Sequence, residues 1–142
     1  MRAALLLLVA ACSGPAPKAP APPVSEPGAL AEKPYFRIDP GPAAACATGG
    51  TCEAKVVLTA RAGYHVNPEY PYKFVADPSS DVAIDGTGKF VVDDELHGTM
   101  TITFRPAKAG ALTLSGTFKL SVCSADECAI DAPKIALTVP AT

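Results

Sequence analysis

Four cysteines in two closely spaced pairs are the residues of this chain with the most distinctive chemistry. Five residues separate Cys46 from Cys52, and four separate Cys123 from Cys128, while Cys12 stands alone near the N-terminus. Cysteines pair in oxidising compartments, and a disulfide that a thiolate can reach exchanges through a mixed disulfide. The spacing predicts two local disulfides, although four cysteines allow three connectivities.

The two pairs differ in their surroundings. Cys46 and Cys52 enclose small residues ahead of a predicted strand, so we interpret them as a structural disulfide. A ring of this size contributes about 2 to 3 kcal/mol on the chain-entropy view. In the strand that ends at Cys123 the even positions are apolar, so alternation places Cys123 on the polar, exposed face. Residue types alone leave two roles open for the Cys123–Cys128 pair, namely redox activity and a second structural disulfide.

The pattern of the 142 residues predicts one all-β domain. Apolar and polar residues alternate in twos, and Pro, Gly, Asn and Asp mark the turns between such segments. The predicted strands cover residues 35–38, 56–60, 72–76, 82–84, 90–92, 100–104, 112–123 and 135–139. We therefore expect an antiparallel immunoglobulin-like β-sandwich of about 7–9 strands over residues 35–142.

The first 34 residues predict export and a tether. Residues 1–11 combine Arg2 with an apolar run, which is typical of a signal peptide. Val-Ala-Ala-Cys at 9–12 resembles the bacterial lipobox, so Cys12 is expected to carry lipid, the alternative being a spare thiol. Residues 12–34 are rich in proline and alanine, which predicts an extended, disordered tether. These features indicate the periplasmic side of a bacterial cell envelope, and Ser13 favours the outer membrane over the inner one.

Several other functions are disfavoured by the composition. Twelve basic residues against 14 acidic ones give a net charge of −2, which argues against nucleic-acid binding. His65, His97 and Met100 invite a copper site, but alternation places Met100 in the core. The acidic triplet at 93–95 is typical of a solvated turn rather than of a hydrolase. We expect a monomer with no metal and no cofactor.

Three short motifs occur in a characteristic order between residues 38 and 139. They are Gly63-Tyr64-His65-Val66-Asn67 after an early strand, Asp94-Glu95-Leu96-His97-Gly98 between two strands, and the segment 118–128, which ends in the second cysteine pair and is followed by Pro133. Their order and spacing resemble the N-terminal periplasmic domain of the thiol:disulfide interchange protein DsbD. Leucine at 96 replaces an aromatic residue of that family's cap loop, and Cys46 and Cys52 are additions to its pattern.

The resemblance implies an immunoglobulin-like fold and a role for each motif. Cys123 and Cys128 would be the redox-active pair, and Leu96 in the cap loop 94–98 would cover their disulfide until a partner displaces it. The other residues of the cap loop and of the site flank would be Asp94, Glu95, His97, Gly98, Tyr64, His65 and Asn67. The implied partners are periplasmic thiol/disulfide proteins, with electrons supplied by a separate membrane donor.

Two functional hypotheses follow from these patterns. The first is a membrane-tethered domain with thiol:disulfide interchange activity at Cys123 and Cys128. The alternative is a non-catalytic lipoprotein module in which both disulfides are structural. In that case the tyrosine-rich segment 64–72 or a sheet edge would bind another protein.

Overall fold

A computed structural model of the chain describes Gly14 and residues 28–142, and its regular structure there consists of strands. The strands are β1 (Ala31–Lys33), β2 (Phe36–Pro40), β3 (Cys52–Ala60), β4 (His65–Val66), β5 (Lys73–Ala76), β6 (Val82–Val92), β7 (His97–Pro106), β8 (Gly110–Cys123), β9 (Cys128–Asp131) and β10 (Lys134–Ala141). The predicted signal peptide, Cys12 and most of the predicted tether lie outside the described residues.

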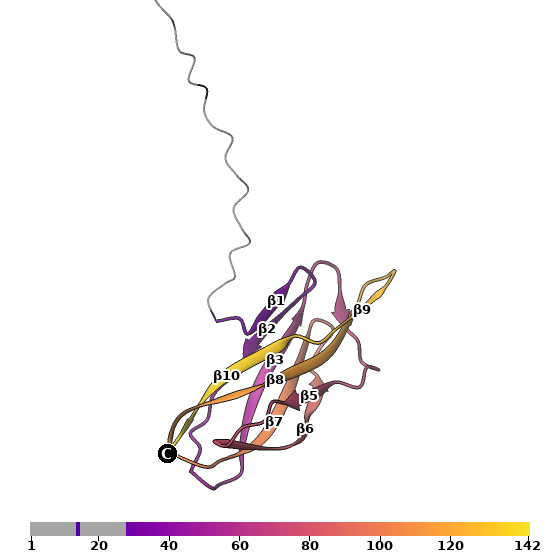
Figure 1. The fold of residues 1–142 in the computed structure, drawn as a ribbon. Coiled ribbons are helices and arrows are strands. Elements are labelled where there is room, and N and C mark those ends of the chain that lie inside the picture. The colour runs from indigo at the N-terminus through magenta and orange to yellow at the C-terminus, as the bar shows by residue number, and fades with distance from the viewer. Residues whose placement is uncertain (1–13, 15–27) are drawn as a thin grey trace, which may run out of the picture.

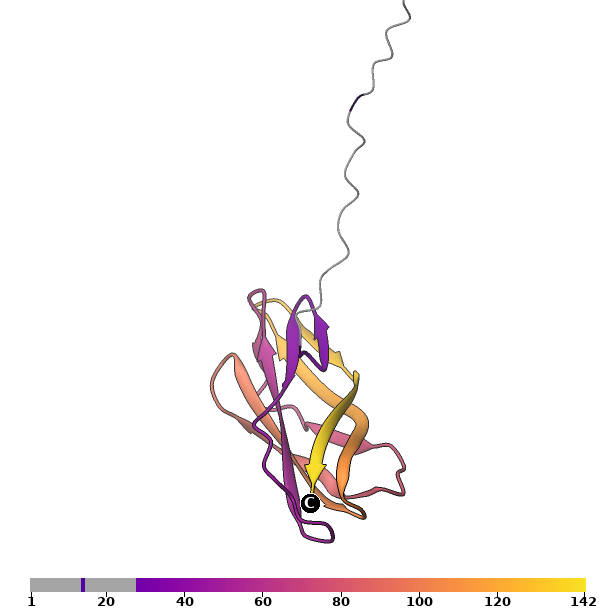
Figure 2. The same ribbon diagram turned by 90° about the vertical axis from the view of Figure 1, so that its left-hand side faces the viewer.

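The strands form two antiparallel sheets. One sheet has the order β1-β2-β3-β7-β6, and the other is built around β8, which pairs with β10, β9, β5 and β4. Figures 1 and 2 show the two layers and place β9 at the opposite end of the molecule from the C-terminus. The prediction of an antiparallel, sandwich-like all-β fold is confirmed.

The long strand β8 sets the register of its sheet. The pairing that places Cys123 opposite Cys128 continues without a shift along β9 and β10 to the far end of β8. Between β9 and β10, the amide of Phe118 donates a hydrogen bond to the carbonyl of Pro133 (3.0 Å). Together β9 and β10 therefore act as one strand beside β8.

Alternating side chains of both sheets fill the core. The largest fully buried side chains are Phe36, Phe74, Phe104, Phe118, Ile38, Leu58, Met100, Ile102, Leu114 and Leu120. They come mostly from strand positions whose period of two was visible in the sequence. Met100 is fully buried, which agrees with its predicted place in the core.

The predicted strands differ from the observed ones in several places. The described residues form ten strands rather than about 7–9, and β4 and β9 were not predicted. Residues 82–84 and 90–92 were expected as separate strands, but they belong to one strand, β6, whose register shifts between Asp85 and Lys89. Gly86 and Gly88 have positive φ angles of 70° and 78°, so the glycines form a bulge within the strand rather than a turn. In addition, β1 lies within the range predicted as tether, because its polar side chains pair with residues far along the chain.

Tyr72 ties the segment after β4 to β8. Its hydroxyl lies 2.7 Å from the carbonyl oxygen of Ser121 and 2.8 Å from that of Asn67. The ring stacks on Phe90 with centroids 3.7 Å apart. Burial raises the pKa of the Tyr72 phenol to about 12. The phenol therefore stays protonated and donates a hydrogen bond throughout the ordinary pH range.

Replacing Tyr72 with Phe removes this hydroxyl and keeps the ring. We expect Tyr72→Phe to lower the free energy of unfolding by about 1 kcal/mol, the usual net contribution of one hydrogen bond. In the wild type the free energy of unfolding should also fall as the pH rises from 10 towards 12, because unfolding then releases a proton that the folded state retains. The variant should lose less over that interval. Urea unfolding at several pH values measures both effects.

The matched control is Tyr70→Phe, because within residues 28–142 no hydrogen bond of the Tyr70 hydroxyl accompanies its edge contact with Tyr72. Equal losses in the two variants would contradict a specific role for the Tyr72 hydroxyl.

Candidate disulfide-exchange site

Three neighbouring strands bring His65, Cys123 and Cys128 into one row. The register pairs His65 of β4 with Cys123 of β8, and Cys123 with Cys128 of β9. Paired residues of antiparallel strands place their side chains on the same face of the sheet. Cys123 and Cys128 form a disulfide across the hairpin, with Cα atoms 3.9 Å apart.

The two cysteines of this disulfide differ in accessibility. Cys123 is only 7% exposed, whereas Cys128 is an exposed residue. The sequence prediction of an exposed Cys123 is therefore wrong. The alternation predicted the face of β8 on which Cys123 lies correctly. However, β4 and β9 flank both edges of β8 at this point, and residues 120–123 are all buried.

The loop 124–127 that joins β8 to β9 is compact and acidic. The Ser124 amide donates to the carbonyl of Glu127 (2.7 Å), and the Ser124 hydroxyl accepts the amides of Asp126 (3.3 Å) and Glu127 (3.2 Å). Asp126 and Glu127 are exposed next to Cys128. Two carboxylates at this position disfavour a thiolate at Cys128 once the disulfide is reduced.

Tyr64 connects the turn between β3 and β4 to this loop. In that turn Ala62 and Gly63 both have positive φ angles, 53° and 82°, and the Tyr64 amide donates to the carbonyl of Arg61 (3.0 Å). Glycine is the residue that adopts such angles most readily. The turn directs the Tyr64 hydroxyl to Glu127, to which it donates a hydrogen bond of 2.6 Å. This hydrogen bond raises the pKa of Tyr64.

The hairpin of β1 and β2 supports β9 through Asp131. Lys33 forms an ion pair with the Asp131 carboxylate, and the Tyr35 hydroxyl donates to the same oxygen at 2.9 Å. The Tyr35 ring also lies against that of Tyr64, with centroids 5.5 Å apart. Burial opposes ionisation of Asp131, but hydrogen bonds, led by that from Lys33, outweigh it and lower the pKa of this carboxyl group.

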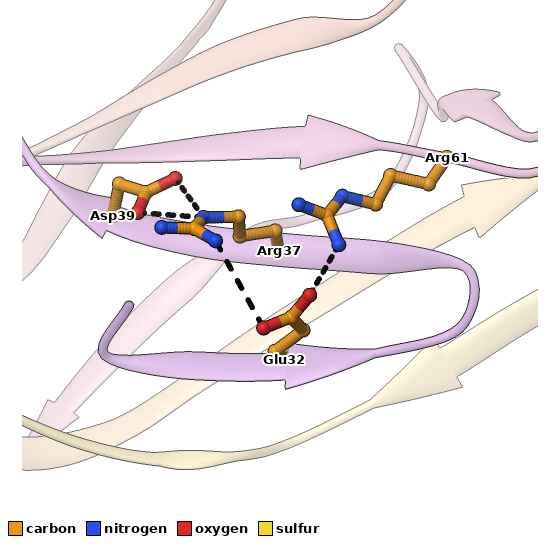
Figure 3. A network of polar contacts seen from close by, with 4 residues as sticks. All are labelled: Glu32, Arg37, Asp39 and Arg61. Atoms are coloured by element: carbon orange, nitrogen blue, oxygen red, sulfur yellow. Dashed lines mark hydrogen bonds and ion pairs between the residues drawn. The ribbon is translucent and has the colours of Figure 1, made fainter. Parts of the chain in front are cut away.

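An ion-pair network holds the same hairpin to the rest of its sheet. Figure 3 shows Glu32 between Arg37 and Arg61, with Arg37 also directed at Asp39. The Arg37 Nε atom lies 2.8 Å from both carboxylate oxygens of Asp39, and Glu32 forms an ion pair with Arg61. The network connects β1 and β2 to the residue that follows β3, so the support of β9 extends into the first sheet.

The cap loop predicted at 94–98 connects β6 to β7 and is closed by Asp94. The Asp94 carboxylate accepts hydrogen bonds from the amides of Leu96 (2.8 Å) and His97 (2.9 Å) and lies 2.8 Å from Nδ1 of His97. These contacts, the Leu96 amide foremost, lower the pKa of Asp94. Gly98 lies so close to the Phe90 ring that a Cβ atom there would clash with it.

The cap loop reaches the disulfide through β4. The Val66 amide donates to the carbonyl of Glu95 (2.8 Å), and the Ala60 amide donates to that of Leu96 (2.7 Å). The Leu96 side chain is 48% exposed. It lies beside a shallow pocket whose other lining residues include Tyr64, His65 and Glu95. β4 and β8 therefore lie between the cap loop and Cys128 of β9.

Asn67 has a positioning role within the fold. Its amide and its side-chain Nδ2 atom donate to the carbonyl (3.2 Å) and the hydroxyl (3.3 Å) of Ser121. Its Oδ1 atom accepts the amide of Glu69 (3.1 Å). Asn67 thus provides hydrogen-bond donors for the carbonyl and hydroxyl of the fully buried Ser121, which lies two residues before Cys123 on the same face of β8.

The disulfide between Cys46 and Cys52 lies at the other end of the molecule. Cys46 is buried and forms a bridge with Ala141. The Thr48 amide donates to the carbonyl of Thr142, and the Thr142 amide donates to that of Cys46, both at 2.8 Å. This disulfide loop holds the C-terminal strand and takes no part in the site around Cys128.

The structure brings together most of the predicted site residues. His65, Cys123 and Cys128 form one row, Tyr64 contacts its loop, and the cap loop joins β4. Sequence reasoning missed Lys33 and Tyr35, which hold β9, and the β9 residues Ile130 and Asp131. No local pattern could have revealed them, because Lys33 and Asp131 are 98 residues apart.

Comparisons with known proteins do not assign a function, so the evidence for function is the geometry of the site. No protein-family model, curated protein or solved structure matches this chain. Within residues 28–142 and Gly14, the structure contains no helix capable of crossing a membrane.

The Asp131 contacts generate a pH-dependent prediction. Because the folded pKa of Asp131 is lowered, its contribution to stability is present above the unfolded value and is lost as the pH falls through the folded value. At pH 7, we expect Asp131→Asn to lower the free energy of unfolding by about 1 to 2 kcal/mol, since hydrogen bonds to a charged group are lost. The difference from the wild type should shrink below about pH 4.

Denaturant unfolding of both proteins between pH 2 and 8 provides the measurement, with Asp126→Asn in the exposed loop as the matched control. A constant difference across that range would show that the charge of Asp131 contributes nothing.

Proposed function

We propose that this protein is an immunoglobulin-like sandwich that exchanges thiols and disulfides with partner proteins at Cys123 and Cys128. The observation that supports this proposal best is the unequal accessibility of a disulfide across a hairpin end, with Cys128 exposed and Cys123 buried. A partner thiolate can reach Cys128, while Cys123 is protected by β4 and β9 on either side of β8.

The proposed exchange proceeds in two successive steps. A thiolate of a reduced partner attacks Sγ of Cys128, the bond between the two sulfurs breaks, and Cys123 leaves as a thiolate. The second thiol of the partner then loses its proton and attacks the partner's own sulfur in the mixed disulfide. A disulfide forms within the partner, and Cys128 leaves as a thiolate. The partner thus gives up two electrons, and the two protons lost by its thiols convert Cys123 and Cys128 to thiols.

The fold tolerates such a change because most of its contacts do not depend on this disulfide. The strand β8 remains paired with β10, β5 and β4 after reduction. β9 keeps its ladder to β8 and its contacts through Asp131. The ring closed by the disulfide is small, so its loss costs only about 2 kcal/mol in chain entropy.

The remaining parts of the proposal come from the sequence. A lipid on Cys12 and the segment 12–34 would hold the domain at the periplasmic side of a bacterial envelope membrane, preferably the outer one. The domain would act as a monomer and receive electrons from a separate membrane donor. The resemblance to the DsbD N-terminal domain implies that the cap loop with Leu96 covers the disulfide; here it would shield the Cys123 side through β4 and leave Cys128 open to a partner.

A non-catalytic interaction module is the second candidate. The acidic pair Asp126 and Glu127 favours it, because carboxylates beside Cys128 oppose formation of its thiolate. In this case both disulfides are structural, and the protein binds partners without chemistry.

The reduction potential of the Cys123–Cys128 pair tests the proposal. We expect a value between about −120 and −270 mV, the range of exchange proteins. The protein is equilibrated with glutathione buffers, free thiols are alkylated, and each pair is mapped by mass spectrometry. A value below about −300 mV would assign a structural role to the pair and support the interaction module.

Two double variants serve as controls for this measurement. Cys46→Ala/Cys52→Ala should keep the potential of the other pair and should lower the free energy of unfolding by about 2 to 3 kcal/mol. Cys123→Ser/Cys128→Ser should remain folded and lose exchange activity. In cells, single Cys123→Ser or Cys128→Ser variants should trap a partner as a mixed disulfide, and trapping by neither variant would count against exchange.

A further inference from the structure

The outer edge of β9 is open beside the exposed cysteine. On either side of the ladder between β8 and β9, and in the same register, Ser124 donates to Glu127 and Phe118 donates to Pro133. Alternation along an antiparallel pair therefore directs the amides and carbonyls of Cys128 and Ile130 away from β8. Within residues 28–142, β9 has β8 as its one strand neighbour, so these backbone groups face outward without a strand partner.

The two exposed side chains of this edge strand, those of Cys128 and Ile130, share one face because the residues are two positions apart. Ile130 is 69% exposed, the largest exposed fraction among the large hydrophobic residues of the described chain. Ala129 and Asp131 face the other way, where Asp131 is held by Lys33. The supports of β9 therefore leave both the edge and the face carrying Cys128 accessible.

The geometry of disulfide exchange directs the partner to this edge. A thiolate attacks along the line of the sulfur–sulfur bond, from the side opposite the leaving sulfur. Since Cys123 lies on the β8 side of Cys128, the attacking chain approaches from beyond β9. A mixed disulfide then places the two Cα atoms about 5.5 to 6 Å apart. Neighbouring strands have nearly this separation, with paired Cα atoms about 4.5 to 5.5 Å apart.

We propose that the partner's cysteine-containing segment binds in extended form as an additional strand along the edge of β9, with Ile130 as its apolar contact. The inference rests on the proposed exchange at Cys128 and names the kind of partner that it serves. Outward backbone groups of Cys128 and Ile130 would hydrogen-bond to the segment, and the same pairing would align its thiolate with Cys128. A partner whose cysteine lies on an extended, accessible segment is therefore preferred over one whose cysteine opens a helix.

The test compares a peptide with glutathione as reductant of the full domain. The probe is a capped seven-residue peptide with one central cysteine, two lysines and otherwise Val and Thr. In the wild type we expect this peptide to react faster than glutathione. Ile130→Pro removes one outward amide and leaves the ladder to β8 intact, because proline is tolerated where the amide faces outward from an edge strand. The peptide rate should fall about three- to tenfold, because one hydrogen bond and the apolar contact of the Ile130 side chain are lost.

Two controls isolate the edge. Ala136→Pro changes an outward-facing position of β10 on the same edge, remote from the disulfide, and should leave both rates unchanged. The native Pro140 occupies an equivalent position, which shows that this strand accommodates proline there. A peptide with N-methylated amides should lose its advantage over glutathione with the wild-type protein.

A second measurement does not depend on the proline variant or on the potential of the pair. In Cys123→Ser, Cys128 is joined by a mixed disulfide either to the peptide or to glutathione, and amide hydrogen exchange is followed by NMR. We expect slower exchange at Ile130 in the peptide adduct alone, with Ala136 unchanged. Equal exchange in both adducts, or equal peptide rates in the wild type and Ile130→Pro, would overturn the added-strand proposal. If glutathione still reduces the pair at a potential above about −270 mV, the proposed function stands nonetheless.

Discussion

The backbone ladder of β8 is the interaction on which the other features depend. This strand pairs along its whole length with β9 and β10 on one edge and, over its second half, with β5 and β4 on the other. Its even positions supply the core, including Phe118 and Leu120. Its last residue is Cys123, so the same register that builds the sheet also fixes the cysteine opposite its partner. The site is thus an extension of the fold rather than an addition to it.

Around that ladder, the hairpin end is supported from one side and open on the other. Tyr64 holds Glu127 in the loop, and Lys33 with Tyr35 holds Asp131 at the end of β9. All of these contacts come from the first sheet or from the turn beside it. They fix the position of β9 without covering Cys128, which gives a rigid support for an accessible sulfur. Exchange through a mixed disulfide requires this combination of a fixed strand and an accessible sulfur.

Much of this could be predicted from the sequence, because period-two alternation reports on strands that bury one face. The fold class, the burial of Met100 and the closeness of Cys123 to Cys128 all follow from such local patterns. The burial of Cys123 could not be predicted, because alternation specifies a face and says nothing of what flanks the strand. The contact of Lys33 with Asp131 joins two ends of the chain and leaves no local pattern. The bulge in β6 was mistaken for a turn because glycines serve both structures.

The distribution of aromatic residues has an optical consequence. The chain contains no tryptophan and four tyrosines. Tyr35, Tyr64 and Tyr72 bond to residues 121–131, and Tyr70 contacts Tyr72, so all four lie at the end of the molecule that carries the Cys123–Cys128 disulfide. Disulfides quench the emission of nearby phenols. The intrinsic fluorescence of the native protein therefore arises beside this one disulfide, which gives its oxidation state a signal that needs no added label and that the distant Cys46–Cys52 pair does not share.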